Sequence, residues 1–223
     1  MILPTKFAVD TELLTQAKFS LPSDQFRYTI NEPSGNFFYD PWAIKPEFVN
    51  TVWAKFLSVL PENIGEARII VLDPGTCYHS HSDIDDRYHL NISGTNCYLV
   101  DLDKNTMYPL INDGQWYDMD ASPRHSAVNF GATHRIQLVV RKLLSRNILT
   151  DSVRVTLTTD LAEDDARYLF DNQLSSILNR INKQKLISNF SYQGRSVSFE
   201  IERKNKSLVE TMAPPQFKIT YND

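Results

Sequence analysis

Seven short segments between residues 67 and 144 constrain the fold more than any other feature of the sequence. Each segment is rich in β-branched or aromatic residues: "ARIIVL", "RYHLNI", "NCYLVDL", "TMYPLI", "QWYDMD", "HSAVNF" and "RIQLVVRKLL". Turn-forming stretches such as "DPGT", "SGTN" and "NDG" separate them. Short strands with frequent turn signals are typical of a β-sandwich or barrel. Within this region, "LVDLDKNTMYPLINDGQW" predicts two successive hairpins in an antiparallel meander.

The flanking parts of the chain are predicted to be mixed. Residues 45–61 carry apolar residues at helical spacing, with a proline in the first turn, and predict one helix. Farther on, Asp160 followed by Glu163 is a capping-box pattern for a long helix, with strands before and after it. We find no candidate chemistry in this last part. We therefore predict an N-terminal mixed segment with a supporting helix (1–66), a β core (67–144) and a small C-terminal α+β appendage (145–223).

Composition limits the possible partners and compartment. The 223 residues carry a formal net charge of −4, which argues against a nucleic-acid partner bound mainly through phosphates. The start of the chain lacks a signal-peptide pattern, and no apolar run is long enough to span a bilayer. Two cysteines are too few for a disulfide framework. We expect a soluble cytoplasmic protein without a membrane partner, and the sequence does not indicate its oligomeric state.

Candidate metal ligands occur in "CYHSHSDIDDRYHLNIS" (77–93). On a strand, His81 and Asp83 would point to the same face and could bind one divalent ion, although alone such a pair is more often a hydrogen-bonded surface pair. His125, in "PRHSAVNFG", could supply a third ligand from an opposite strand. Two histidines and one carboxylate leave coordination positions open, as in non-haem Fe(II) oxygenases. A structural zinc site would instead have four protein ligands.

Arg135 lies on the following strand, ten residues after His125. An arginine inside a small barrel is costly unless an anion meets it, and its planar fork matches a carboxylate. A dicarboxylate that chelates iron at one end, such as 2-oxoglutarate, would meet this need. Arg87, His89 and Asn91 alternate on "RYHLNI" and share a face. That face either points inward, beside the same anion, or faces water, and periodicity alone leaves both possibilities open.

The run "PGTCYHSHSD…RYHLNI…GQWYDMD…HSAVNFGATHRIQLVV" resembles the aspartyl/asparaginyl β-hydroxylase family of 2-oxoglutarate- and Fe(II)-dependent oxygenases, to which the cis-proline hydroxylases also belong. The resemblance covers residues 67–142. It implies a mainly β fold with flanking helices around a double-stranded β-helix core of the jelly-roll or cupin type. The site residues it implies are His81, Asp83 and His125 as iron ligands, Arg135 on the distal carboxylate of 2-oxoglutarate, and Arg87 and His89 assisting.

The implied reaction is hydroxylation of a C–H bond of an amino acid, free or in a peptide or protein, with Fe(II), 2-oxoglutarate and O₂. The aromatic loop at 31–42 and residues 84–86 are candidates for contacting the substrate. Trp116 and Asn129 are further candidates, although a core position and a turn position, respectively, also fit them. We predict that His79 is not a ligand and that His134 points away from Arg135. The alternatives are a cupin-type iron dioxygenase that does not use 2-oxoglutarate and a non-catalytic jelly-roll binding module.

Overall fold

The computed structural model describes residues 2–21 and 26–222. The chain forms two compact units. One comprises Met1–Ser80 and Asp85–Leu143, and the other comprises His81–Ile84 and Leu144–Asp223. The short segment 81–84 thus belongs to the second unit although the chain on both sides of it belongs to the first.

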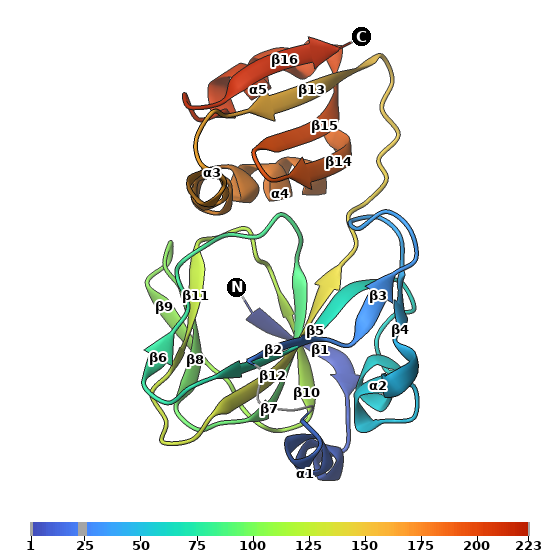
Figure 1. The fold of residues 1–223 in the computed structure, drawn as a ribbon, viewed down its shortest axis with the longest axis vertical. Helices are drawn as coiled ribbons and strands as arrows, with labels where there is room; N and C mark the ends of the chain where they lie inside the picture. The colour runs from blue at the N-terminus through green and yellow to red at the C-terminus, as the bar shows by residue number, and fades with distance from the viewer. Residues whose placement is uncertain (1, 22–25, 223) are drawn as a thin grey trace. The chain divides into compact units, whose positions relative to one another are not determined.

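Two antiparallel sheets form most of the first unit (Figure 1). The large sheet has the order β1-β10-β7-β12-β5-β2, and the small sheet has the order β6-β11-β8-β9. The strands of the large sheet are β1 (Ile2–Ala8), β2 (Arg27–Thr29), β5 (Ile64–Leu72), β7 (Arg87–Ser93), β10 (Gln115–Met119) and β12 (Arg135–Lys142). Those of the small sheet are β6 (Thr76–Cys77), β8 (Cys97–Asp101), β9 (Thr106–Pro109) and β11 (His125–Asn129).

All seven predicted segments form strands, and the prediction of a mainly β chain with flanking helices is confirmed. The eighth strand of this region, β6, has two residues and was not predicted, because two residues show no alternation. Of the two predicted hairpins, β8–β9 is confirmed and β9–β10 is wrong, because β10 joins the large sheet between β1 and β7. Trp116 of β10 pairs with Leu90 of β7, and both side chains are completely buried there.

Both faces of the central strands β7 and β12 of the large sheet are largely buried. One face is apolar and packs against α1 (Thr11–Phe19) and α2 (Val52–Leu57), through a core that includes Leu138. On the other face, Arg87, His89 and Asn91 are only 4%, 6% and 1% exposed. The polar face of "RYHLNI" therefore points inward, and the alternative that it faces water is excluded.

Residues 45–61 do not form one helix. They form a 3-10 turn at Pro46–Phe48 and the short helix α2, because Thr51 between them has an extended backbone. The preceding aromatic loop lies between β3 (Asn31–Pro33) and β4 (Trp42–Ile44), which pair with each other.

The second unit contains a four-stranded antiparallel sheet with the order β14-β15-β13-β16, and helices pack against it (Figure 1). Its strands are β13 (Ser152–Thr158), β14 (Ile187–Gln193), β15 (Ser196–Glu202) and β16 (Lys218–Asn222). Its helices are α3 (Glu163–Leu169), the π turn η2 (Phe170–Leu174), α4 (Ser175–Lys183), the 3-10 turn η3 (Arg203–Asn205) and α5 (Lys206–Met212). The predicted long helix is thus divided by a π turn.

The predicted capping box is wrong. The residue before α3 is Ala162, which offers no side-chain cap, and the carboxylate of Asp160 instead accepts a hydrogen bond from Lys218 Nζ at 2.6 Å. In the part of the chain that the structure describes, no helix is both long enough and apolar enough to cross a membrane.

Truncating the core of the large sheet should destabilise the protein strongly. Leu138 is fully buried between the sheet and its covering helices, so Leu138→Ala removes buried methyl groups and leaves a cavity. We expect it to lower the free energy of unfolding by about 2–5 kcal/mol in urea titrations. Leu3→Ala, at a position that is 52% exposed, is the control and should change it by less than about 0.5 kcal/mol. Equal effects of the two changes would contradict this description of the core.

Candidate metal centre

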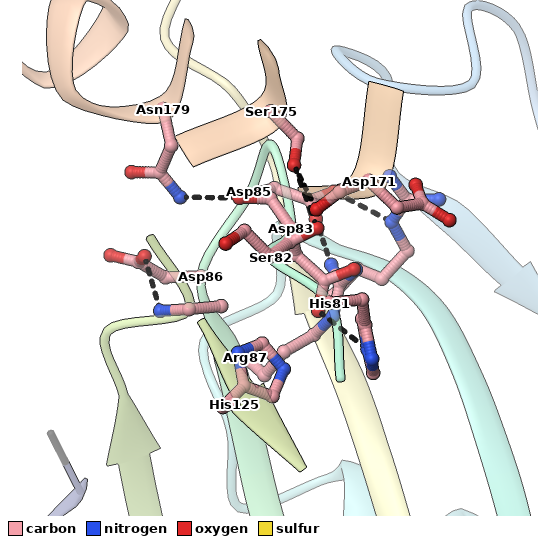
Figure 2. A network of polar contacts seen from close by, with 12 residues as sticks. His81, Ser82, Asp83, Asp85, Asp86, Arg87, His125, Asp171, Ser175 and Asn179 are labelled. Carbon is pink, nitrogen blue, oxygen red and sulfur yellow. Dashed lines mark hydrogen bonds and ion pairs between the residues drawn. The ribbon is translucent and has the colours of Figure 1, made fainter. Parts of the chain in front are cut away.

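The structure brings His81, Asp83 and His125 together, as predicted (Figure 2). One potential ligand atom from each residue lies within 4.8 Å of the other two, so the three side chains could hold one metal ion. His125 is buried, and the other two residues are partly exposed. Two imidazoles and a carboxylate form a ligand set that suits Fe(II) and other first-row metals, and three protein ligands leave positions open for other molecules.

His125 is oriented for coordination by its own neighbourhood. It is the first residue of β11 and pairs with Asp101 of β8. Its Nδ1 lies 2.9 Å from the carbonyl oxygen of Pro123. Because a carbonyl can only accept, Nδ1 carries the hydrogen and Nε2 keeps its lone pair. A histidine ligand with its second ring nitrogen fixed in this way is the usual arrangement around protein-bound metals.

His81 and Asp83 do not lie on a strand, so that part of the prediction is wrong. His81 forms a single isolated β bridge, and the residues on either side lie outside helices and strands. The two side chains still converge, with 3.9 Å between His81 Nε2 and Asp83 Oδ2. Segment 81–84 takes its shape from hydrogen bonds with residues 171–179 rather than from a sheet.

Arg135 is buried without a counter-ion among the described residues. Its side chain is 1% exposed, and its Nη2 donates to Gln137 Oε1 at 3.0 Å. Arg135 Nε and Nη1 and Gln137 Nε2 have no hydrogen-bond partner in the part of the chain that the structure describes. The guanidinium carbon lies 5.7 Å from the centre of the Tyr78 ring. Burial lowers the pKa of Arg135 and raises that of Tyr78, which shows that this region of the interior disfavours charge.

Arg87 is also buried, but its charge is balanced within the chain. It forms an ion pair with Asp85, whose other oxygen accepts hydrogen bonds from Arg141 Nε at 2.6 Å and Nη2 at 2.5 Å. The guanidinium of Arg141 in turn stacks on Phe37 and Phe38 of the aromatic loop, 4.4 and 4.9 Å from the ring centres. The assisting roles predicted for Arg87 and for the buried His89, and substrate contact by the aromatic loop, remain predictions.

The two weaker substrate candidates lie in structural positions. Trp116 belongs to the apolar core on the opposite face of the large sheet. The amide of Asn129 donates to the carbonyls of Leu72 and Thr133, at 3.0 and 2.9 Å, and its oxygen accepts from Gly131 N–H at 3.0 Å. These contacts favour the core and turn interpretations of the two residues.

The remaining histidines lie at the surface. His79 is exposed, and His134 is exposed and lies 2.9 Å from a carboxylate oxygen of Asp73. Neither is part of the metal-ligand cluster.

Sequence reasoning missed the residues that hold segment 81–84: Asp171, Ser175 and Asn179. They occur in a stretch whose helical periodicity predicts only packing, and their contacts are with residues about ninety positions earlier. No local pattern could have indicated them.

The comparisons with known proteins give only distant structural likenesses. No family model and no curated protein matches the chain. The chain is similar in structure to a cupin domain from Bordetella pertussis Tohama I, with a TM-score of 0.32, 13% identity, and coverage of 37% of this chain and 84% of that one. It is similar to a sugar phosphate isomerase of a cupin superfamily from Silicibacter pomeroyi, with a TM-score of 0.29, 18% identity, and coverage of 40% and 53%.

A third similar structure is CapF with the inhibitor 3-isopropenyl-tropolone, with a TM-score of 0.30, 16% identity, and coverage of 36% of this chain and 25% of that one. The chain thus spans about half of the isomerase and a quarter of CapF. At these TM-scores and identities the likenesses show neither a family nor an activity.

The two cysteines should differ sharply in reactivity. Cys77 is exposed, whereas Cys97 is buried, contacts Asn129 Oδ1 at 3.3 Å, and has its thiol pKa raised by burial. A raised pKa leaves less thiolate at a given pH. At neutral pH, we expect Ellman's reagent to modify one thiol rapidly and the second only on unfolding. Cys77→Ser should abolish the fast phase, and two fast thiols in the native protein would contradict the described burial.

Proposed function

We propose that the protein is a 2-oxoglutarate- and Fe(II)-dependent dioxygenase that hydroxylates a C–H bond of an amino acid, free or within a peptide. One observation carries the proposal. The chain combines a cluster of two histidines and one carboxylate with a buried arginine that has unpaired donors. These are the two binding functions that a metal-chelating dicarboxylate requires.

The strand order supports a double-stranded β-helix as the core of the first unit. Apart from the β8–β9 hairpin, consecutive strands from β5 to β12 alternate between the sheets, with β10-β7-β12-β5 in one and β6-β11-β8-β9 in the other. Two four-stranded antiparallel sheets joined in this way form a jelly roll. In such a core the side chains between the sheets come from alternate residues of every strand, so polar residues can gather inside while the outer face stays apolar.

His81, Asp83 and His125 fit the metal by donor type and by mutual distance. Fe(II) bound by them would supply O₂ chemistry in which 2-oxoglutarate is converted to succinate and CO₂ while a substrate C–H becomes C–OH. The contribution of the chain is to hold ligands and substrate in place and to exclude water. His125 contributes Nε2, kept available by the hydrogen bond between its Nδ1 and the Pro123 carbonyl.

Arg135 and Gln137 fit the carboxylate. The unpaired Nε and Nη1 of Arg135 and the Nε2 of Gln137 are donors without acceptors among the described residues, and a carboxylate is a group of acceptors. The charge balance points the same way. Arg87 is paired with the carboxylate of Asp85, whereas no carboxylate among the described residues pairs with Arg135. A bound carboxylate would supply both the missing acceptors and the missing charge.

The test is anaerobic titration of the purified protein with Fe(II) and then 2-oxoglutarate, followed by the visible metal-to-ligand charge-transfer absorption of the chelate. We expect the band in the wild type and its loss in Asp83→Ala, which removes a ligand. Arg135→Ala should require far more 2-oxoglutarate for the same band. His79→Ala, at an exposed histidine outside the cluster, is the matched control and should behave as the wild type.

Other results would identify the rival functions. Iron binding without the band would indicate an iron dioxygenase that does not use 2-oxoglutarate. Absence of iron binding would leave a non-catalytic binding module with a carboxylate pocket. A positive result would be followed by measuring succinate release with free amino acids and with peptides, which separates the two substrate classes.

Replacing the buried Arg135 should have different effects on the free energy of unfolding without ligand and on the binding of 2-oxoglutarate. Arg135→Met removes a desolvated cation while filling much of its volume, so we expect the free energy of unfolding without ligand to be unchanged or raised by up to about 4 kcal/mol. In the wild type, 2-oxoglutarate with Mn(II) at about one hundred times its Kd should stabilise the fold by about 2.7 kcal/mol. The variant should lose this stabilisation. Denaturant titrations measure both effects, and an Arg135→Met protein that is strongly destabilised without ligand would contradict the proposed role.

A further inference from the structure

The segment that carries His81 and Asp83 needs support from elsewhere in the chain. It has one isolated bridge at His81 and no strand neighbours that would fix the backbone of residues 82–84. A side chain can coordinate a metal only if its own backbone is held in place, so the hydrogen bonds of this segment determine where the two ligands lie.

Three hydrogen bonds join segment 81–84 to the helical stretch of its own unit (Figure 2). The backbone N–H of Ser82 donates to the carbonyl of Asp171 at 2.7 Å. The hydroxyl of Ser175 donates to the carbonyl of Ser82 at 2.8 Å, and Asn179 Nδ2 donates to the carbonyl of Asp83 at 3.0 Å. Ser82, Ser175 and Asn179 are each at most 1% exposed, so water does not compete for these bonds.

The π turn between α3 and α4 makes the first of these bonds possible. In an α-helix, the N–H of Ser175 would donate to Asp171. Here it donates one residue farther back, to the carbonyl of Phe170. The carbonyl of Asp171 accepts instead from Ser82 N–H, and the Ser175 hydroxyl also lies 3.2 Å from it. π turns within helices occur frequently at functional sites.

Ser175 and Asn179 are the first and fifth residues of α4 and therefore lie on the same side of this helix, one turn apart. Their donors reach two consecutive carbonyls, those of Ser82 and Asp83. Asp83 is itself a candidate metal ligand, and Ser82 lies between the two candidates His81 and Asp83. These two bonds fix the peptide planes on either side of Asp83. The plane that follows His81 is fixed by the Ser82 N–H bond to the Asp171 carbonyl, which the Ser175 hydroxyl also contacts.

We propose that Ser175 and Asn179 are positioning residues for the metal ligands His81 and Asp83, acting through the backbone of segment 81–84. This inference rests on the proposed metal site. Partners that orient metal ligands typically change metal affinity 10- to 100-fold when they are removed. The C-terminal part of the chain would then be part of the metal-binding machinery, although it supplies only the supports of the ligands.

The test is titration of the full-length protein with Co(II), followed by its visible absorption bands, which report both affinity and coordination geometry without any turnover. We expect Ser175→Ala and Asn179→Ala to bind Co(II) about 10- to 100-fold more weakly than the wild type, with altered bands. Ser175→Thr keeps the hydroxyl and should restore both. Asn182→Ala is the matched control, because this buried asparagine of the same helix contacts Asn147 rather than segment 81–84.

Thermal unfolding of each variant shows whether it is folded. If Asn179→Ala does not fold, Asn179→Leu replaces it, since this change keeps about the size of the side chain and removes the Nδ2 donor without burying a charge. Wild-type affinity and spectrum in the folded Ser175 and Asn179 variants would overturn the positioning role and leave the metal site intact. Failure of the wild type itself to bind Co(II) would refute the metal site and the positioning role together.

Discussion

Burial of both faces of the central strands of the large sheet is the constraint on which the rest of the first unit depends. Polar and apolar residues alternate along β7 and along Arg135–Leu138 of β12, but neither set of side chains is left exposed to solvent. Their apolar set, with Leu90 and Leu138, packs against α1 and α2. The polar set must therefore occupy the interior, where every charge needs a partner. An amphipathic strand normally places its polar side in water. Here the polar side is buried, which brings several polar side chains together inside the first unit.

The arginines in this part of the structure fall into two groups, those paired with a carboxylate and one that is not. Arg87 and Arg141 share the carboxylate of Asp85, and Arg141 also lies 3.9 Å from Glu66, so each of these two arginines has a carboxylate partner. Among the described residues, the guanidinium of Arg135 contacts the amide oxygen of Gln137 and the face of the Tyr78 ring, neither of which carries a charge. Leaving one desolvated cation unbalanced costs stability that a protein with no use for the charge could recover by replacing it with an apolar residue. The missing counter-ion of Arg135 is therefore stronger support for an anionic ligand than the burial of Arg135 alone.

The sequence allowed the strands and the cluster of candidate metal ligands to be predicted, and each failed prediction has a specific physical reason. β-Branched and aromatic composition between turn signals predicted β5 and every strand from β7 to β12, which have four or more residues, whereas the two-residue β6 is too short to show such a pattern. The second hairpin was assigned by proximity in sequence, but Trp116 is buried against β7 of the other sheet. Whether the polar face of β7 points inward depends on whether helices cover the apolar face of the sheet. The alternation of residues within one strand carries no information about such helices. The supports at Ser175 and Asn179 depend on contacts distant in sequence.

Three aspartates within four residues could each have been the metal carboxylate, and their hydrogen bonds distinguish them. Asp85 is bound by two arginines, so its use as a metal ligand would deprive the buried Arg87 of its carboxylate partner Asp85. The carboxylate of Asp86 accepts from Ala121 N–H at 3.2 Å and belongs to that turn. Asp83 is the one whose carboxylate lies with His81 and His125. Its backbone carbonyl, by contrast, is engaged by Asn179. The chain thus fixes the main chain of Asp83 through one group and presents the carboxylate through the other, which is the division of roles that a metal ligand requires.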